Sequence, residues 1–178
     1  MTQEEIKKLV ERYPYLLPRN VFTGEVSKDY DYTYIRGIGE IPVGWNKLFL
    51  QMCEDIRQPL IDANHIDEFM FSQIKEKNNC MKCYNFGAPE EVHDIINKYS
   101  VMASYVCTRC GEPATYENQG YIESFCDDCW KDLGYESKEK IEFKPYYKVV
   151  VFKNGKGYEK TISFEDEWNR YLNSIKNE

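Results

Sequence analysis

The sequence lacks any long hydrophobic run. Its apolar stretches fall well short of the roughly 20 consecutive residues that a membrane-spanning helix requires. Residues 1–13 form a charged amphipathic pattern, which differs from a secretory signal peptide. We therefore expect a cytoplasmic protein that does not bind membranes.

Histidine and positive charge are also scarce. His65 and His93 are the only histidines, and no serine or cysteine nucleophile pattern accompanies either one. We expect both to be structural, and since no pair of carboxylates stands out, we expect no enzyme. Lysine and arginine total 23 against 30 aspartates and glutamates, a net charge of −7. Such a chain repels nucleic-acid phosphates on average and leaves only local basic patches as candidate binding surfaces.

A disulfide framework is not expected either, because the seven cysteines are an odd number. Free thiols are typical of a reducing compartment. With 178 residues, the chain can form one medium-sized domain with a real hydrophobic core, with or without a small appended module. We find no internal repeat and no low-complexity tract.

Hydrophobic periodicity predicts helices and a strand in the first part of the chain. Residues 2–12 have a helical pattern that begins with a capping box. The alternation over residues 30–35 predicts a short strand. Residues 44–63 place large apolar side chains at helical spacing, which predicts a core-facing helix that Pro59 should kink or end.

Two β-hairpins and two further helices are expected after residue 67. The hairpins fall at residues 68–86 and 146–164, with turns at Asn78-Asn79 and Asn154-Gly155, and the helices at residues 88–106 and 164–176, the latter capped by Ser163. Asparagine and glycine favour these turns because both tolerate a positive φ. The order of elements predicts an α+β fold, with helices packed on β-hairpins.

Two Cys-x-x-Cys pairs, fifteen residues apart, are the most informative motif. They consist of Cys107, Cys110, Cys126 and Cys129. A two-residue gap lets two thiolates on a tight turn reach one ion, and the intervening loop is long enough for a small hairpin that returns the second pair. The spacing predicts an embedded treble-clef or zinc-ribbon module that holds one structural Zn²⁺ ion. Two redox dithiols or four buried cysteines are the alternatives.

A four-thiolate shell leaves no open coordination position, so the predicted zinc should have no catalytic role. Zinc deaminases require a His-x-Glu pattern and a proline before Cys-x-x-Cys. Here Val106 and Phe125 precede the two pairs, and neither histidine begins His-x-Glu. The sequence therefore excludes a deaminase of this type.

Cys80 and Cys83 form a third Cys-x-x-Cys pair, within the first predicted hairpin. Residues i and i+3 of a strand point to opposite faces, which suits shared metal coordination poorly unless the strand is bulged. We expect both to act as small packing residues, and a second metal site remains the alternative. Cys53 lies on an apolar helical stripe, where we expect packing as well.

The cysteine module is strongly acidic. Residues 107–129 contain one basic side chain, Arg109, against five acidic ones: Glu112, Glu117, Glu123, Asp127 and Asp128. A four-thiolate Zn²⁺ centre would add a formal charge of about −2. This charge opposes phosphate binding, so we expect the acidic residues to face a protein partner or the module to staple the fold.

Residues 136–160 provide the best surface for nucleic acid. They contain seven lysines and four glutamates, interleaved with aromatic residues. Lys148, Lys153 and Lys156 are the candidate contacts. Nucleic-acid binding through this hairpin is the alternative to protein binding.

Residues 43–130 resemble a group of uncharacterised bacteriophage and prophage proteins. The resemblance rests on Gly44-Trp45 at a helix start, on a Gln-[Ile/Val]-Lys-Glu-Lys hairpin at residues 73–77, on Tyr84, and on the four module cysteines. The chain departs from the pattern at Asn78-Asn79, where the group has Phe-Gly, and at Cys83, where it has an aromatic residue. The resemblance implies an accessory phage protein that works in the bacterial host cell, without an established activity.

These observations favour a non-enzymatic, zinc-stapled phage or prophage protein. We expect it to bind a host or phage protein, for instance to inhibit a bacterial defence system or a nucleic-acid enzyme. We expect three regions: an α+β main part at residues 1–105, the metal module at residues 106–134, and a hairpin with a helix at residues 135–178 that completes the fold.

Overall fold

The computed structural model describes residues 1–135, 139–153 and 156–176, together with all side chains of these ranges except those of residues 139, 152 and 153. It confirms the predicted α+β class. Five α-helices and seven strands are described along the chain. The helices are α1 (Gln3–Arg12), α2 (Asn46–Asp62), α3 (Glu90–Met102), α4 (Asp127–Leu133) and α5 (Glu165–Lys176). The strands are β1 (Met70–Lys77), β2 (Cys80–Phe86), β3 (Tyr116–Glu117), β4 (Ser124–Phe125), β5 (Glu139–Lys140), β6 (Tyr146–Lys153) and β7 (Lys156–Ser163).

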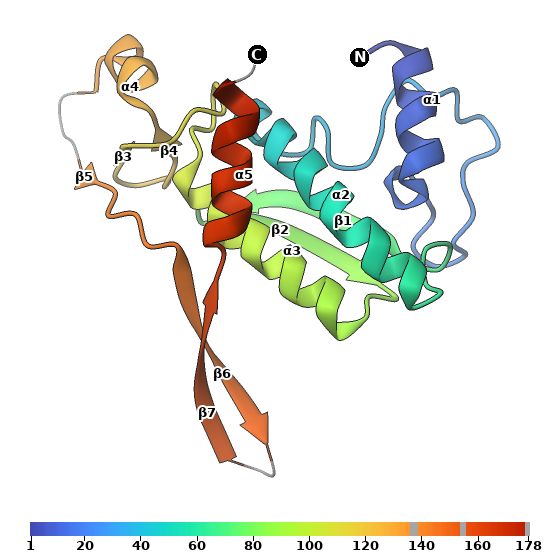
Figure 1. Ribbon diagram of the computed structural model, residues 1–178. Helices are drawn as coiled ribbons and strands as arrows, with labels where there is room; N and C mark the ends of the chain where they lie inside the picture. The colour runs from blue at the N-terminus through green and yellow to red at the C-terminus, as the bar shows by residue number, and fades with distance from the viewer. Residues whose placement is uncertain (136–138, 154–155, 177–178) are drawn as a thin grey trace.

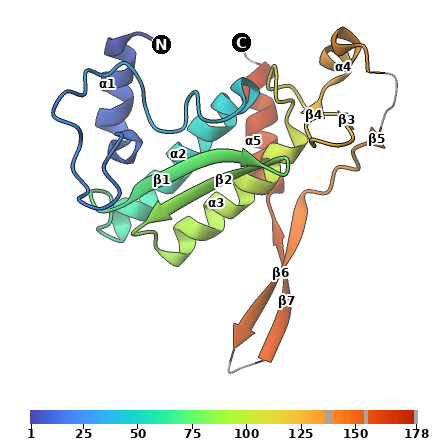
Figure 2. The same ribbon diagram turned by 180° about the vertical axis from the view of Figure 1, so that it is seen from behind.

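The helices α2 and α3 cover one face of the β1–β2 hairpin, and the main core lies between these helices and the hairpin (Figure 1). Viewed from behind, the two strands lie in front of the helices (Figure 2). The face predicted from periodicity is buried: Trp45, directly before α2, and the α2 residues Leu48, Phe49, Met52, Cys53, Ile56 and Leu60 are all fully inaccessible. Cys53 is therefore a packing residue, as expected.

The capping box of α1 is present as predicted. The Thr2 hydroxyl accepts a hydrogen bond from the amide of Glu5, and the Glu5 carboxylate accepts one from the amide of Thr2. Ile6 and Val10 form the buried side of this helix. The two hydrogen bonds of the capping box satisfy amides that the first turn of the helix would otherwise leave unpaired.

The β1–β2 hairpin turns at Asn78-Asn79, as predicted, and both residues have positive φ, at 53° and 57°. A bulge between Phe71 and Gln73 shifts the register of β1. Because the bulge adds one residue, Phe71 and Ile74 are both buried although they stand three positions apart.

The short strand predicted over residues 30–35 is wrong, because this segment is an irregular loop. Tyr32 has a φ of 61°, which no strand allows. Asp31 accepts hydrogen bonds from the amide and the hydroxyl of Thr33, a local turn that competes with strand pairing. Of the two outcomes predicted for Pro59, a kink or an end of α2, the end is wrong, because the helix continues to Asp62 with Leu60 buried in the core.

The C-terminal helix α5 packs beside α2 and α3 and joins the main core (Figure 1). Asp55 of α2 accepts two hydrogen bonds from Arg170, at 2.7 and 2.6 Å, and one from the hydroxyl of Tyr99, at 2.6 Å. Lys98 of α3 pairs with Glu167 at 2.6 Å. The backbone amide of Glu165 donates to Ser163, as the predicted cap requires.

The β6–β7 hairpin leaves the body of the protein as a two-stranded arm, which both views show (Figures 1 and 2). Ile162 is buried near its base, whereas Val150, Val151 and Tyr158 are exposed by 63, 44 and 55 %. The predicted Asn154-Gly155 turn lies outside the described residues. None of the helices in the described ranges combines the length and the apolar character that crossing a membrane requires.

Replacing Ile56 by alanine should test how much α2 contributes to the core. Because Ile56 is fully buried, we expect the free energy of unfolding to fall by about 2–5 kcal/mol, measured by urea denaturation. Ile61→Ala in the same helix is the matched control, since Ile61 is 38 % exposed and should cost about 1 kcal/mol or less. Equal losses in both variants would contradict this assignment of the core.

Candidate metal centre

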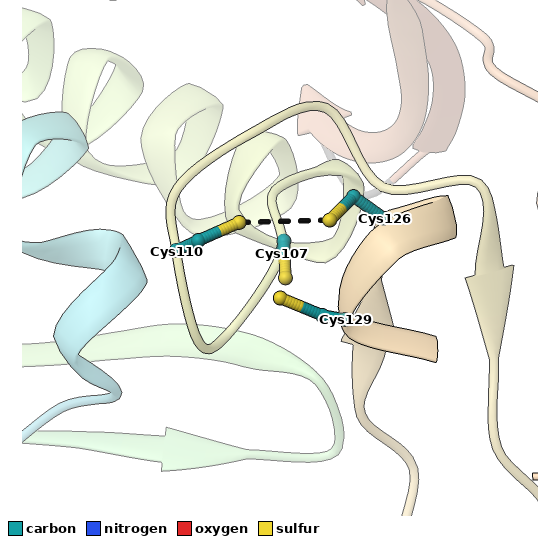
Figure 3. A group of neighbouring side chains, drawn as sticks. All are labelled: Cys107, Cys110, Cys126 and Cys129. Carbon is teal, nitrogen blue, oxygen red and sulfur yellow. Dashed lines mark hydrogen bonds between the residues drawn. The ribbon is translucent and has the colours of Figure 1, made fainter. Parts of the chain in front are cut away.

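The structure brings the four predicted cysteines together from two separate segments. Cys107 and Cys110 lie on a tight turn after α3, and Cys126 and Cys129 lie at the start of α4. Figure 3 shows the four side chains pointing toward a common centre. A turn, a short β3–β4 hairpin and a helix that carries the last pair constitute a treble-clef arrangement.

The spacing of the sulfur atoms fits a tetrahedral metal site. All four lie within 4.8 Å of one another, and the Sγ atoms of Cys110 and Cys126 are 3.6 Å apart. Four sulfurs at about 2.3 Å from a central zinc ion would lie about 3.8 Å apart. A disulfide needs about 2.05 Å, and all four cysteines are free thiols. The four sulfurs thus define a candidate structural metal site, with one ligand at each corner.

The environment shifts the pKa values of the thiols in opposite directions. Burial raises the pKa of the Cys107 thiol, but hydrogen bonds from the backbone amides of Cys126, Cys110 and Arg109 outweigh this effect and leave that pKa below its ordinary value. Burial raises the pKa of Cys129 to about 11 and also raises that of Cys110. A metal ion would bind the thiolates and release the remaining protons.

The first cysteine turn is locked to the main core. The amide of Gly44 donates to the carbonyl of Thr108 at 3.0 Å, and the indole N–H of Trp45 donates to the carbonyl of Val106 at 3.1 Å. Tyr171 of α5 donates to the carbonyl of Gly111. A Cβ atom on Gly44 would lie 2.7 Å from the amide nitrogen of Gly111 and closer still to the carbonyl oxygen of Cys107. Glycine is therefore required at this position.

The module also contacts the turn of the β1–β2 hairpin. The buried side chain of Asn79 donates to the hydroxyl of Ser124 at 2.6 Å, and that hydroxyl donates to the carbonyl of Ser104. Tyr121 donates to the carboxylate of Glu76. The turn predicted at Asn78-Asn79 thus serves a second purpose that the sequence pattern did not indicate.

The module has a small core of its own, formed by the first cysteine of the first turn and by residues from β4 to α4. Cys107, Phe125, Cys126 and Trp130 are buried together, and the rings of Phe125 and Trp130 are 6.0 Å apart. Gly134 ends α4 with a φ of 68°, a common helix C-cap. This cluster is too small to fold without further support, so the metal ligands are its natural staple.

The five acidic residues of the module lie in two different settings. Glu112, Asp127 and Asp128 are exposed and line a hollow of about 350 Å³ beside the cysteines. Glu117 and Glu123 are half-buried in the β3–β4 region. Burial and the neighbouring Glu76 raise the pKa of Glu123. Only the first three line this hollow together, and we call them the acidic face; Asp128 also lies 3.9 Å from the ammonium group of Lys131.

The remaining candidate residues do not join the metal site. Among the described residues, the four cysteines form the only candidate metal cluster. Cys83 packs against the main core, where burial raises its pKa to about 12, and Cys80 is half-buried near the turn. The Nδ1 atom of His65 lies 3.3 Å from the carboxylate of Glu68, and His93 is exposed on α3.

The lysines of the second hairpin are partly neutralised. Lys148 pairs with Glu159 at 2.7 Å, across the β6–β7 ladder. Lys156 is exposed at the start of β7, and the side chain of Lys153 lies outside the described part. The pair at Lys148 reduces the attraction of this arm for phosphate.

Comparison of the chain with protein families, with curated proteins and with solved structures finds no match. The resemblance to phage proteins therefore stays a prediction. The function has to be inferred from the geometry of the chain itself.

Replacing Cys110 or Cys126 by serine should abolish metal binding. Each change removes one corner of the sulfur cluster, so we expect less than about one tenth of the wild-type metal per chain and a partly unfolded module. Elemental analysis and amide hydrogen exchange measure both effects. Cys80→Ser is the control that should keep its metal, because Cys80 lies outside the cluster. Full metal content in Cys110→Ser would contradict the assignment.

Replacing Gly44 by alanine should weaken the module although Gly44 is no ligand. The new methyl group would push the first cysteine turn away from the core. We expect the unfolding midpoint to fall by about 2–12 °C, because such overpacking costs about 1–3 kcal/mol. We also expect faster loss of metal to a chelator. Val43→Ala, at a neighbouring residue that is 67 % exposed, should change neither quantity.

Proposed function

We infer that the chain is a non-enzymatic binding protein whose fold is stapled by one structural zinc ion. The observation that carries this proposal is the closed cluster of four sulfurs beside an exposed acidic face. Zinc is the ion of choice, because four cysteines in tetrahedral spacing are its characteristic ligand set. With four protein ligands, no corner is left for a substrate or a water molecule.

A second hollow adds no sign of a catalytic centre. It measures about 740 Å³ and lies between α3 and β7. Its lining contains neither histidine nor cysteine, as far as the described residues go. Its lysines have acidic neighbours: Lys98 pairs with Glu167, and Lys160 lies 3.9 Å from Asp94. Carboxylates and two hydroxyls, of Thr161 and Ser163, line the hollow. The Ser163 hydroxyl donates to the carbonyl of Pro145 and not to a carboxylate, so it does not form a nucleophile–base pair.

We propose that the acidic face binds a protein partner with a positively charged surface. Glu112, Asp127 and Asp128 are exposed together beside the cysteines, which favours electrostatic steering of a basic partner. A nucleic-acid enzyme has such a surface, because it binds phosphate. Taken with the resemblance to phage proteins, this favours an accessory phage or prophage protein that inhibits a host defence or nucleic-acid enzyme in the bacterial cytoplasm.

Protein capture with matched variants tests the proposed role. The tagged, metal-loaded protein is incubated with bacterial lysate at low and at high salt, and bound proteins are quantified by mass spectrometry. We expect a stoichiometric basic partner that Glu112→Gln combined with Asp128→Asn reduces by about tenfold or more. The control is the double variant Glu11→Gln with Asp29→Asn, which removes the same amount of negative charge at the end of the molecule away from the acidic face. This variant should still capture the partner.

Two outcomes would overturn the proposal. The first is that no protein is captured in stoichiometric amount at any salt concentration. The second is that both double variants reduce capture equally, since a general loss of negative charge would then explain the effect. If capture is lost only after Val150→Ser in the exposed arm, the binding surface is the β6–β7 hairpin and not the acidic face.

A further inference from the structure

A third hollow, of about 470 Å³, lies in the loop between α1 and α2. Figure 1 shows this blue loop beside α1, at the end of the molecule away from α4. Backbone contacts define its shape: Arg19 forms a β-bridge with Val26, and the amide of Asn20 donates to the carbonyl of Glu25 at 2.9 Å. The hollow is therefore formed by the turn itself, and it is independent of the metal module.

The charge of this hollow is opposite to that of the whole chain. Arg19, Lys28 and Arg36 line it, against a single carboxylate from Glu25. The remaining polar lining consists of Asn20, Thr23, Ser27 and Tyr34. Neither Arg19 nor Lys28 forms an ion pair with any described residue. A local charge of this sign in a chain of net charge −7 needs a reason.

Both arginines use one nitrogen for the fold and leave the other edge unused. The Nη1 atom of Arg19 donates to the carbonyl of Gly24, and that of Arg36 donates to the carboxylate of Glu40, each at 3.0 Å. The Nε atoms of both arginines are buried and have no hydrogen-bond partner among the described residues. The Nε–Nη2 edge of a guanidinium is the edge that holds an oxyanion through two parallel hydrogen bonds.

We propose that this hollow is a binding site for a phosphate monoester, with Arg19 and Arg36 as its two guanidinium clamps. A buried N–H without an acceptor is unfavourable, and an anion between the two edges would satisfy both after a small rotation. A carboxylate has two oxygens and can engage one edge in full. A phosphate monoester has three terminal oxygens and two negative charges, so it can engage both arginines and Lys28 together.

The rim of the hollow fits an organic group on the phosphate. Tyr34 lines the hollow and is 54 % exposed, and its ring meets that of Tyr30 edge-to-face at 5.4 Å. A fixed, exposed aromatic ring is a stacking platform for a flat ligand such as a nucleobase. The phosphate thus provides the affinity, and Tyr34 distinguishes a nucleoside monophosphate from free phosphate.

Calorimetric titration of the full, metal-loaded chain at low ionic strength tests this site. The ligands are inorganic phosphate, adenosine monophosphate and adenosine. We expect saturable binding of both phosphate compounds, tighter for the nucleotide, and none of adenosine. Equal affinity for phosphate and nucleotide would restrict the site to free phosphate and overturn the role of Tyr34. No saturable binding of either phosphate compound would overturn the proposal altogether.

Variants that conserve the charge distinguish hydrogen bonding by the guanidinium edge from simple attraction between charges. Arg19→Lys and Arg36→Lys keep the charge but lose the edge, so we expect each to weaken nucleotide binding by about tenfold or more. Lys131→Gln, at an exposed position on α4 at the other end of the molecule (Figure 1), removes a distant positive charge and should change the affinity by about twofold or less. Unchanged affinity in both arginine variants would overturn the proposal.

Glu40→Gln controls for the structural role of Arg36. It removes the ion pair at Nη1 but leaves the Nε–Nη2 edge in place, so binding should be retained or strengthened. A loss as large as that of Arg36→Lys would show that Arg36 acts only through the fold and would remove it from the site. The unfolding midpoint of each variant, measured in parallel, shows that the chain remains folded.

Discussion

The contact between the first cysteine turn and the main core is the constraint on which the rest of the structure depends. The backbone of Gly44 and the indole of Trp45 are hydrogen-bonded to this turn, and a side chain at position 44 would collide with the backbone of Cys107 and Gly111. Three elements far apart in the sequence, the start of α2, the end of α3 and helix α5, converge on this turn. Two of the four sulfurs are thereby fixed by the packing of the main core before any metal ion binds.

The other two sulfurs have much less support. They depend on α4 and on a small aromatic cluster around Trp130, with contacts to the main body through Asn79, Ser124 and Tyr121. A metal ion in the sulfur cluster would join this part to the fixed turn. Structural zinc contributes on the order of 10 kcal/mol to such modules, comparable to the net stability of a whole domain. Metal binding and folding of the part of the module around α4 should therefore be one process.

The electrostatic pattern of the protein becomes clear only from the arrangement in space. Negative charge gathers on the acidic face beside the cysteines, and positive charge gathers in the hollow of the α1–α2 loop. The β6–β7 arm exposes apolar side chains, and one of its lysines is paired within the hairpin. Two surfaces of opposite sign, at opposite ends of the molecule, can bind different ligands without competing.

Local patterns in the sequence were sufficient for most of the helices, for both hairpins and for the cysteine pairs. Periodicity identified the buried face of α2, and Asn78-Asn79 marked a turn, because these signals depend on residues close in the chain. The same approach failed at residues 30–35, where side-chain hydrogen bonds of Asp31 produce a turn inside an alternating pattern. At Pro59 the pattern left two outcomes open, a kink or an end, and the helix does not end there but continues to Asp62.

The sequence by itself determined the α+β class and the set of four cysteines, since ligand type and spacing are local properties. Only the tertiary structure decided that Gly44 and Tyr171 bind the first cysteine turn. It alone also shows that three of the five acidic residues line one hollow and that Arg19 and Arg36 line another. Those relations join segments that lie from 15 to more than 60 positions apart in the sequence. They follow from how the core packs, which no local pattern encodes.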